Sequence, residues 1–107
     1  MGIVETIICS AIHHDDGEEH MHQPKNIKTG FVIAGRRHHN CIATRFTLLK
    51  FWDGDRLKLG KETFGFLTSD DRFVGREEAG IIALATGQVK ELKHFNGKEL
   101  DSSDLFL

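Results

Sequence analysis

The sequence predicts a small single-domain α+β protein in which two helices pack against a mostly antiparallel sheet. Its 107 residues are enough for one domain. Hydrophobic residues make up 39% and charged residues 28%, which is the balance of a globular protein. Runs of β-branched residues indicate strands, and two segments space their apolar residues as amphipathic helices do. The expected order is β-β-β-α-β-α followed by a tail strand.

Strands are expected in the first third of the chain. Residues 3–12 are rich in β-branched side chains and carry no helical stripe, which is typical of a strand buried over much of both faces. An Asp-Gly turn at 15–17 predicts a hairpin whose return strand covers 18–22. Pro24, which cannot donate to a sheet, ends that strand. A further apolar strand is expected at 31–34.

The first helix is expected to begin near Asn40 and to bury one apolar line. That line comprises Ile42, Ala43, Phe46 and Leu49. A polar loop that contains Trp52 is then expected from 51 to 61. It leads into an apolar strand at 64–68, which ends in a Ser-Asp-Asp turn at 69–71.

The second helix has clear boundary residues. Gly75 stands at its N-cap position, acidic residues follow in the first turn, and Gly87 stands at C′. The buried line is expected to comprise Ala79, Ile82, Ala83 and Thr86. Gly80 lies mid-helix, where it costs about 1 kcal/mol relative to alanine, so it indicates close packing.

Composition and charge exclude several classes of protein. Lys and Arg total 14 against 16 for Asp and Glu, a formal net charge of −2, whereas non-specific nucleic-acid coat proteins are strongly basic. No apolar run approaches the length of a membrane span, which is about 18 residues. Cys9 and Cys41 are too few for a disulfide scaffold, so we expect reduced, buried thiols.

The histidine-rich first half invites a metal or catalytic interpretation. His20 and His22 would share one strand face, but a zinc site needs three or four protein ligands and no CxxC or HExxH motif is present. Cys41 follows His38 and His39, yet the chain has no G-x-S-x-G elbow and no Walker loop. We therefore expect no metal and no catalytic residue.

The most informative stretch is the basic segment at 35–40. It follows a predicted strand and opens a predicted helix, where unpaired amides and the helix dipole favour an anion. Arg36 and Arg37 add forked donors suited to phosphate, and the histidines add potential charge. The alternative is a solvated basic surface.

A second basic segment precedes the second helix. Arg72 and Arg76 flank Phe73, so the arginines could contact phosphate while Phe66 or Phe73 stacks on a base. The alternative is that both phenylalanines belong to the core.

Taken in order, these segments resemble a family of small phage proteins, the first described family of Thoeris anti-defence proteins. The matching pieces are G-R-R-H-H-N at 35–40, the G-F-L…R-F-V-G-R-E-E-A block at 65–79, G-Q-V at 87–89 and S-S-D-L-F at 102–106. The resemblance covers residues 30–107. Gly75 stands where Asn or Asp is usual and Ser103 where Glu is frequent, which puts a polar ligand contact at position 75 in question.

The resemblance implies a sponge and not an enzyme. Residues 1–107 would form a single nucleotide-binding domain that holds cyclic ADP-ribose isomers, and in some members cyclic oligonucleotides, intact in the cytoplasm of the infected bacterial host. It also implies a homo-oligomer, a hexamer built from dimers, with no cofactor and with neither a membrane nor a nucleic-acid polymer as partner. The expected ligand-binding residues are Arg36, Arg37, His38, Phe66, Thr68, Arg72, Phe73, Arg76 and Asp104.

Two other classes of function remain open at this point. One is a cyclic nucleotide phosphodiesterase or hydrolase that uses the histidine cluster with a metal. The other is a structural or host-takeover protein with no small ligand.

Overall fold

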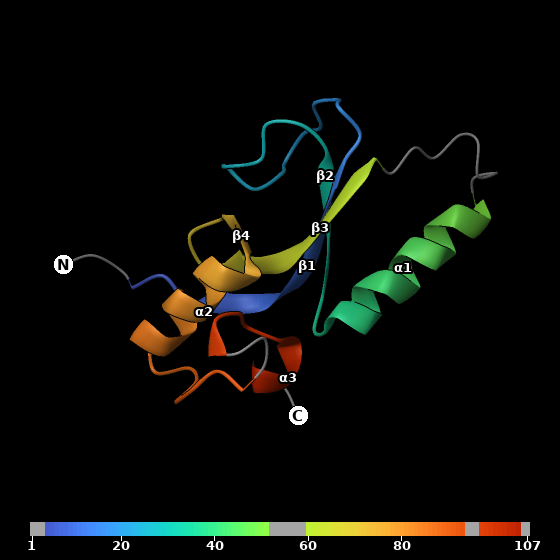
Figure 1. Ribbon diagram of the computed structural model, residues 1–107. Helices are drawn as coiled ribbons and strands as arrows, with labels where there is room; N and C mark the ends of the chain where they lie inside the picture. The colour runs from blue at the N-terminus through green and yellow to red at the C-terminus, as the bar shows by residue number, and fades with distance from the viewer. Residues whose placement is uncertain (1–3, 52–59, 94–96, 106–107) are drawn as a thin grey trace.

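The architecture was established from a computed structural model, which describes residues 4–51, 60–93 and 97–105 (Figure 1). The elements are β1 (Ile7–Asp15), β2 (Phe31–Gly35), α1 (His38–Phe51), β3 (Lys61–Thr68), β4 (Phe73–Gly75), α2 (Arg76–Ala85) and α3 (Ser102–Leu105). The order is therefore β-β-α-β-β-α with a short final helix. The predicted class, a small α+β domain with an antiparallel sheet and two main helices, is confirmed.

The sheet is antiparallel throughout, with strand order β2-β1-β3-β4. A line of small residues crosses it: Ala11 of β1 lies opposite Ala34 of β2 and Gly65 of β3, and Gly65 lies opposite Gly75 of β4. The β-branched run therefore forms the central strand β1, which pairs on both sides. This position explains why β1 is buried over most of its length.

Two hydrophobic clusters form the core, one under each main helix. Ala79 and Ala83 of α2 pack with Ile7 of β1 and Phe66 of β3. Cys41 of α1 packs with apolar residues of β1 and β2. Figure 1 shows the two helices beside different halves of the twisted sheet. His38, at the start of α1, joins the clusters, because its ring lies 5.4 Å from the Phe64 ring and 5.1 Å from the Phe66 ring.

The predicted return strand at 18–22 is wrong. These residues belong to a long connection, 16–30, and β2 takes the place beside β1 that they were expected to fill. His22 adopts a left-handed backbone conformation, φ 61°, which is incompatible with an extended strand. β4 was not expected, because three residues are too few to show an alternating pattern.

The predicted apolar line of α1 is right only in part: Ile42 packs against the cluster that contains Cys41, but two of the four predicted residues are exposed. Phe46 is 57% exposed and Ala43 is exposed, whereas Cys41 is fully buried. Leu48, seven residues after Cys41, packs against the same cluster. Between them on that line lies Arg45, which forms an ion pair with Glu62 of β3. A charged residue therefore lies on the face of α1 that packs toward the sheet. Because of it, the sequence does not show the packed face as a continuous apolar line.

The prediction for α2 is confirmed. Gly75 is its N-cap residue, and Gly87 has a φ of +75°, the left-handed conformation that suits C′. Ala79 and Ala83 are buried. A Cβ atom on Gly80 would lie 2.8 Å from Leu92 Cδ1, so this glycine allows the tail to pack closely against the helix.

The predicted tail strand is wrong for the described residues. Residues 102–105 form α3, and 89–93 contain no strand although Val89 is buried. The Trp52 part of the predicted loop at 51–61 lies outside the described residues, while Phe51 is the last residue of α1. No described helix has the length and apolar character that a membrane crossing requires.

Side-chain amides from outside the sheet bind its outer strands. Gln23 Oε1 accepts a hydrogen bond from Val32 N on β2, at 3.0 Å. Asn26 pairs with both backbone groups of Phe73 on β4: its Nδ2 donates to the carbonyl oxygen at 2.7 Å and its Oδ1 accepts from the amide at 2.8 Å. These amides hold the 16–30 connection against both edges of the sheet.

Candidate functional site

The structure separates most of the predicted ligand-binding residues into two groups. We call the first the α3 cluster; it comprises Arg37, Arg76 and the segment 100–104, and Arg36 precedes Arg37 in the chain. We call the second the Glu5 cluster; it comprises Glu5, Thr68, Arg72 and Glu78. The remaining predicted residues, His38, Phe66 and Phe73, are buried.

In the α3 cluster, two arginines from distant parts of the sequence meet one segment. Arg37 Nε lies 3.4 Å from Ser102 Oγ. Arg76 Nη1 donates to the Leu100 carbonyl oxygen at 3.1 Å and lies 3.5 Å from Asp101 Oδ1. The backbone joins them as well, because Leu100 N donates to the Arg76 carbonyl oxygen at 2.9 Å. The residues that begin α1, begin α2 and precede α3 are therefore neighbours.

The start of α1 carries no acidic residue in its first turn. Asn40 Oδ1 accepts a hydrogen bond from Arg37 N at 3.0 Å, and Ser10 Oγ donates to the Arg36 carbonyl oxygen at 3.1 Å, so the turn before the helix is fixed in place. Arg36 is exposed and Arg37 is half-buried. The positive end of the helix dipole is thus next to two arginines without a carboxylate of its own helix nearby.

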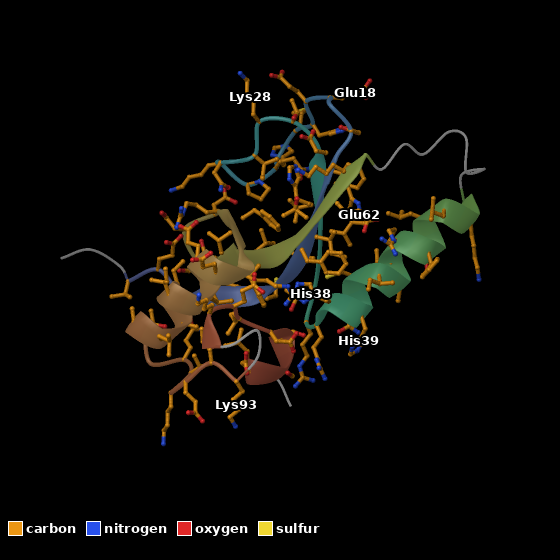
Figure 2. The ribbon with its side chains drawn as sticks, viewed as in Figure 1. Glu18, Lys28, His38, His39, Glu62 and Lys93 are labelled. Atoms are coloured by element: carbon orange, nitrogen blue, oxygen red, sulfur yellow. The ribbon has the colours of Figure 1, made fainter. Side chains whose placement is uncertain are left out.

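His38 is a packing residue in this structure. Its side chain, labelled in Figure 2, is buried, and Nε2 lies 2.8 Å from the Gly65 carbonyl oxygen. Burial lowers the pKa of His38, so the ring is neutral at physiological pH. The expected cationic contribution of this imidazole to anion binding is therefore missing.

Asp104 has a local structural role. Its Oδ2 accepts a hydrogen bond from Asp101 N at 2.9 Å, while Asp101 Oδ2 accepts from Ser103 N at 3.0 Å. This reciprocal pair is a capping box, which satisfies amides at the start of a helix. The carboxylate holds α3 in place and thereby positions the residues that contact Arg37 and Arg76.

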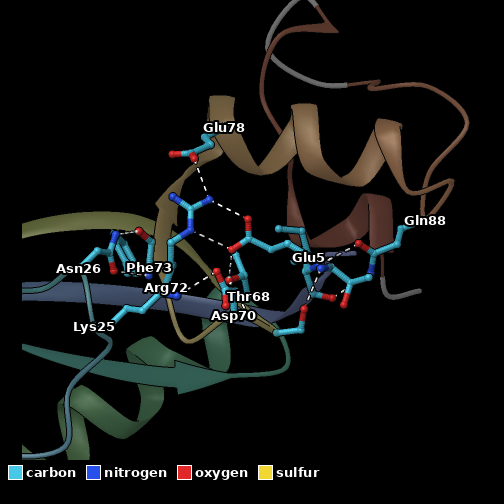
Figure 3. Close-up of polar contacts among 12 residues, drawn as sticks. Glu5, Lys25, Asn26, Thr68, Asp70, Arg72, Phe73, Glu78 and Gln88 are labelled. Carbon is cyan, nitrogen blue, oxygen red and sulfur yellow. Dashed lines mark hydrogen bonds and ion pairs between the residues drawn. The ribbon is translucent and has the colours of Figure 1, made fainter. Parts of the chain in front are cut away.

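The Glu5 cluster is a compact ion-pair network (Figure 3). Both carboxylate oxygens of Glu5 accept hydrogen bonds from the Arg72 guanidinium, from Nε and Nη2, each at 2.8 Å. Thr68 Oγ1 donates to Glu5 Oε2 at 2.6 Å, and Arg72 Nη2 also lies 2.9 Å from Glu78 Oε2. Hydrogen bonds from Arg72 and Thr68 lower the pKa of Glu5 to about 2. Glu5 is therefore ionised at every physiological pH.

The stacking role predicted for Phe66 or Phe73 is not supported. Phe66 is 0% exposed and belongs to the core cluster under α2. Phe73 is also buried; its backbone is bound by Asn26 and its ring lies 5.7 Å from the His13 ring. Phe64 is half-buried, and the centre of its ring lies 5.9 Å from Arg76 Cζ in the α3 cluster.

The first half supplies no strand on which His20 and His22 could share a face. Ligand atoms of Asp16, Glu18 and His20 lie within 4.8 Å of one another, but the groups are at the surface and His20 Nε2 is already 2.7 Å from Asp16 Oδ2. Burial raises the pKa of the Cys41 thiol to about 11, so this group is protonated at neutral pH. The expected burial of Cys41 is confirmed, while Cys9 is only partly buried.

A family model for the phage T4 y16D protein matches residues 6–106. The chain belongs to this family. A search of curated proteins and a search of solved structures each gave no significant match. The family places the chain among phage proteins and covers every element described above.

Two residues missed by the sequence analysis organise this fold. Glu5 fills the fork of Arg72, which lies more than sixty positions away along the chain, so no local pattern could reveal the pair. Gln88 lies in the G-Q-V motif, and its amide pairs with both backbone groups of Ile7, each at 2.8 Å. The position of Gln88 directly after the C′ glycine of α2 was the sequence signal that could have indicated its contact with Ile7. No comparable signal marks Glu5.

Proposed function

We propose that this phage protein is a sponge for a cyclic nucleotide immune messenger, which it binds and holds without cleaving. The observation that carries the proposal is the α3 cluster. Three of the motif segments that resemble the Thoeris anti-defence family are far apart in the sequence, yet Arg37, Arg76 and Ser102 lie together. Because these separate motifs meet at one place in the fold, a common ligand is favoured over three unrelated solvated surfaces.

The chemistry of the α3 cluster suits a phosphate-bearing ligand. Arginine offers forked donors that match phosphate oxygens, and the start of α1 adds backbone amides and the positive end of the helix dipole. Arg37 and Arg76 contact hydroxyl and carbonyl oxygens at distances of 3.1–3.4 Å, besides the longer 3.5 Å contact with Asp101. A phosphate could replace these partners with stronger charge-assisted bonds.

The ligand class that we propose is cyclic ADP-ribose isomers, with cyclic oligonucleotides as a second class. Binding without cleavage requires complementary charge and shape but no general base. We also propose that the protein acts in the cytoplasm of the infected bacterial host, where such a messenger would be made. No cofactor, membrane or nucleic-acid polymer takes part in this proposal.

We further propose that the protein works as a homo-oligomer, a hexamer built from dimers. The face of α2 that points away from the sheet supports association. Ile81 is 65% exposed and Leu84 is 42% exposed, whereas Ala79, Gly80 and Ala83 are buried and Ile82 packs against the core. A helix that displays two of its three large apolar residues to solvent is well suited to pack against a second copy.

The proposal is tested by recovering the ligand. Purified protein is mixed with cyclic ADP-ribose or one of its isomers, separated from free nucleotide by filtration, and then denatured by heat. We expect the nucleotide to be depleted from the filtrate and to reappear, unchanged in mass and chromatographic retention, after denaturation. A parallel sample in which Arg37 and Arg76 are both replaced by alanine should leave the nucleotide in the filtrate.

Each alternative class predicts a different result. Recovery of a hydrolysed nucleotide would support the phosphodiesterase or hydrolase alternative and overturn the sponge. A filtrate that retains every cyclic nucleotide tested, together with an unchanged melting temperature, would support a structural or host-takeover protein.

A further inference from the structure

The Glu5 cluster has the form of an occupied anion site. The Glu5 carboxylate receives two parallel hydrogen bonds from the Arg72 fork and a third from Thr68 Oγ1. This donor set, one guanidinium edge and one hydroxyl, is equally suited to two oxygens of a phosphate group. The group in the site is the chain's own carboxylate (Figure 3).

Exchange of this carboxylate for a phosphodiester would keep the charge of the cluster constant. Arg72 is compensated by Glu5 and by Glu78, which sits 2.9 Å from Nη2. A phosphodiester carries one negative charge, as Glu5 does, so the exchange adds no repulsion from Glu78. Addition of a phosphate without loss of Glu5 would instead place three anions around one guanidinium. Binding at Arg72 therefore requires Glu5 to leave.

Glu5 lies before the first residue of β1, so its carboxylate can leave the Arg72 fork without breaking a pairing of the sheet. Its neighbour Thr6 is joined to Ser69 by two hydrogen bonds of 2.9 Å. The side chains of Glu5 and Arg72 remain 23% and 27% exposed, so solvent and a ligand can reach the ion pair. The backbone of β1 itself is held further along, at Ile7, by Gln88.

A hollow of about 340 Å³ adjoins this site, and Thr68 belongs to both. Its lining includes the apolar residues Ile8, Val32 and Leu67, and also His22 and Asp71. These last two are the non-glycine residues with left-handed backbone in the described chain, φ 61° and φ 57°. Such conformations often occur at ligand sites, and here both lie at one hollow.

We propose that Arg72 and Thr68 form a second anion site. Glu5 fills this site in the unliganded protein, and a phosphate group of the nucleotide displaces the Glu5 carboxylate. The remainder of the ligand then enters the hollow beside Thr68, over Ile8 and Leu67. The Glu5 carboxylate thus competes with the ligand for the Arg72 site. This inference rests on the proposed function and assigns a ligand class, a phosphodiester- or pyrophosphate-bearing nucleotide, to a part of the protein distinct from the α3 cluster.

The test uses two substitutions at one ion pair for which competition predicts opposite effects. Affinity for cyclic ADP-ribose and for inorganic pyrophosphate is measured by calorimetric titration of the full chain. Glu5→Gln removes the competing charge, so we expect binding about tenfold tighter; Arg72→Gln removes the donor fork, so we expect binding about tenfold weaker. Glu78→Gln is the matched control for the titration with cyclic ADP-ribose, in which each phosphate carries one negative charge; Glu78 touches the same guanidinium without contacting Thr68, and its effect there should be within about threefold.

A second measurement needs no substitution. Amide resonances of the wild-type protein are followed during titration with pyrophosphate, and we expect those of Glu5, Thr6 and Thr68 to shift together as the segment is released. This measurement covers the case in which Glu5→Gln or Arg72→Gln fails to fold, which a thermal melt of each variant would reveal.

The outcomes separate this inference from the proposed function. Cyclic nucleotide that binds wild type and Glu5→Gln equally, or binds Glu5→Gln more weakly, would overturn the competition while leaving the sponge intact. Saturation by pyrophosphate without any shift at Glu5 would overturn it as well. In a third outcome, no cyclic nucleotide binds the wild type, but pyrophosphate binds Glu5→Gln more tightly and Arg72→Gln more weakly. This result would overturn the proposed sponge function and support the anion site.

Discussion

The two arginine clusters differ in what occupies their donors. In the Glu5 cluster, the edge of the Arg72 guanidinium is filled by two oxygens of one carboxylate, and a second carboxylate sits beside it. In the α3 cluster, Arg37 contacts a hydroxyl at 3.4 Å, and Arg76 contacts a carbonyl and, at a longer distance, Asp101. Arginines that look equivalent in the sequence therefore differ: Arg72 is ion-paired at short range with two carboxylates, whereas Arg37 contacts a hydroxyl at 3.4 Å.

This difference predicts how the two regions respond to a ligand. Arg37 can accept phosphate in exchange for a hydroxyl contact, whereas Arg72 must first lose its ion pair with Glu5. A nucleotide should therefore bind the α3 cluster more readily. The four predictions that follow test this comparison.

The largest effect is expected from a change in the core that supports both regions. Phe66 is fully buried, packs in the cluster under α2, and contacts His38 at the start of α1. Phe66→Ala should lower the free energy of unfolding by about 3–5 kcal/mol, because it removes the ring and leaves a cavity. Chemical denaturation measures this change. A loss below about 1 kcal/mol would mean that the ring is exposed in solution, as a stacking role would require.

The second prediction concerns the two arginines before α1. Arg37 is half-buried and contacts Ser102, whereas the Arg36 side chain is exposed, so Arg37→Ala should weaken binding of the cognate messenger more than Arg36→Ala does. Loss of one charge-assisted phosphate contact costs about 1.5–3 kcal/mol, roughly ten- to a hundredfold in affinity. Calorimetric titration compares the two variants, and thermal melts should change little in either. Wild-type affinity in both would rule out an anion site at this helix start.

The third prediction separates the clusters by pH. The pKa of Glu5 is about 2 in the folded protein, below its ordinary 4.5, so its contribution is complete above pH 4.5 and is lost as the pH falls toward 2. After allowance for solvent screening, we expect about 1 kcal/mol. Wild type should lose this stability in acid, and Glu5→Gln should already lack it at neutral pH.

The control for this measurement lies in the same titration. Burial lowers the pKa of His14 and His38, so the unfolded chain binds more protons than the folded one once the pH falls through about 6.5. This loss should be equal in wild type and in Glu5→Gln. If the substitution removed the loss near pH 6.5 instead of the loss in stronger acid, the assignment of the two transitions would be wrong.

The smallest effect on the fold is expected at the outer face of α2. Ile81→Asp together with Leu84→Asp should change the unfolding free energy of the monomer by less than about 0.5 kcal/mol, because both side chains are exposed. Light scattering should nevertheless show a decrease in mass from six times 12.1 kDa toward smaller species. A wild-type particle of 12.1 kDa would rule out the oligomer, and an unchanged hexamer in the variant would move the interface elsewhere.

The sequence was informative wherever a local rule determines the structure. Gly75 and Gly87 marked the two ends of α2, Gly80 marked a close approach, and the β-branched run marked the central strand. It was misleading where tertiary contacts decide. An ion pair to β3 holds Arg45 on the packed face of α1, which shifted the apparent apolar line.

For the candidate site, too, the sequence predicted the local features and did not predict the tertiary contacts. Residue type and position indicated correctly that Arg37 and Arg76 lie at the starts of helices, but only the fold shows that both contact the 100–102 segment. For Phe66 and Phe73 the sequence allows either a core or a stacking position, since an aromatic residue beside a basic one fits either role. The partner of Arg72 could not be predicted, because Glu5 is distant in sequence and gives no periodic signal.

The amides that bind the two outer strands have a consequence for the behaviour of the protein in a cell. An open strand edge is a template for strand addition and aggregation. Here Gln23 occupies the amide of Val32 on one edge, and Asn26 occupies both backbone groups of Phe73 on the other. If the protein acts by stoichiometric capture, as we propose, it must accumulate to at least the concentration of its ligand. Under that proposal, the occupied edge groups would let it accumulate without polymerising through its sheet, and the proposed self-association would use the helical surfaces.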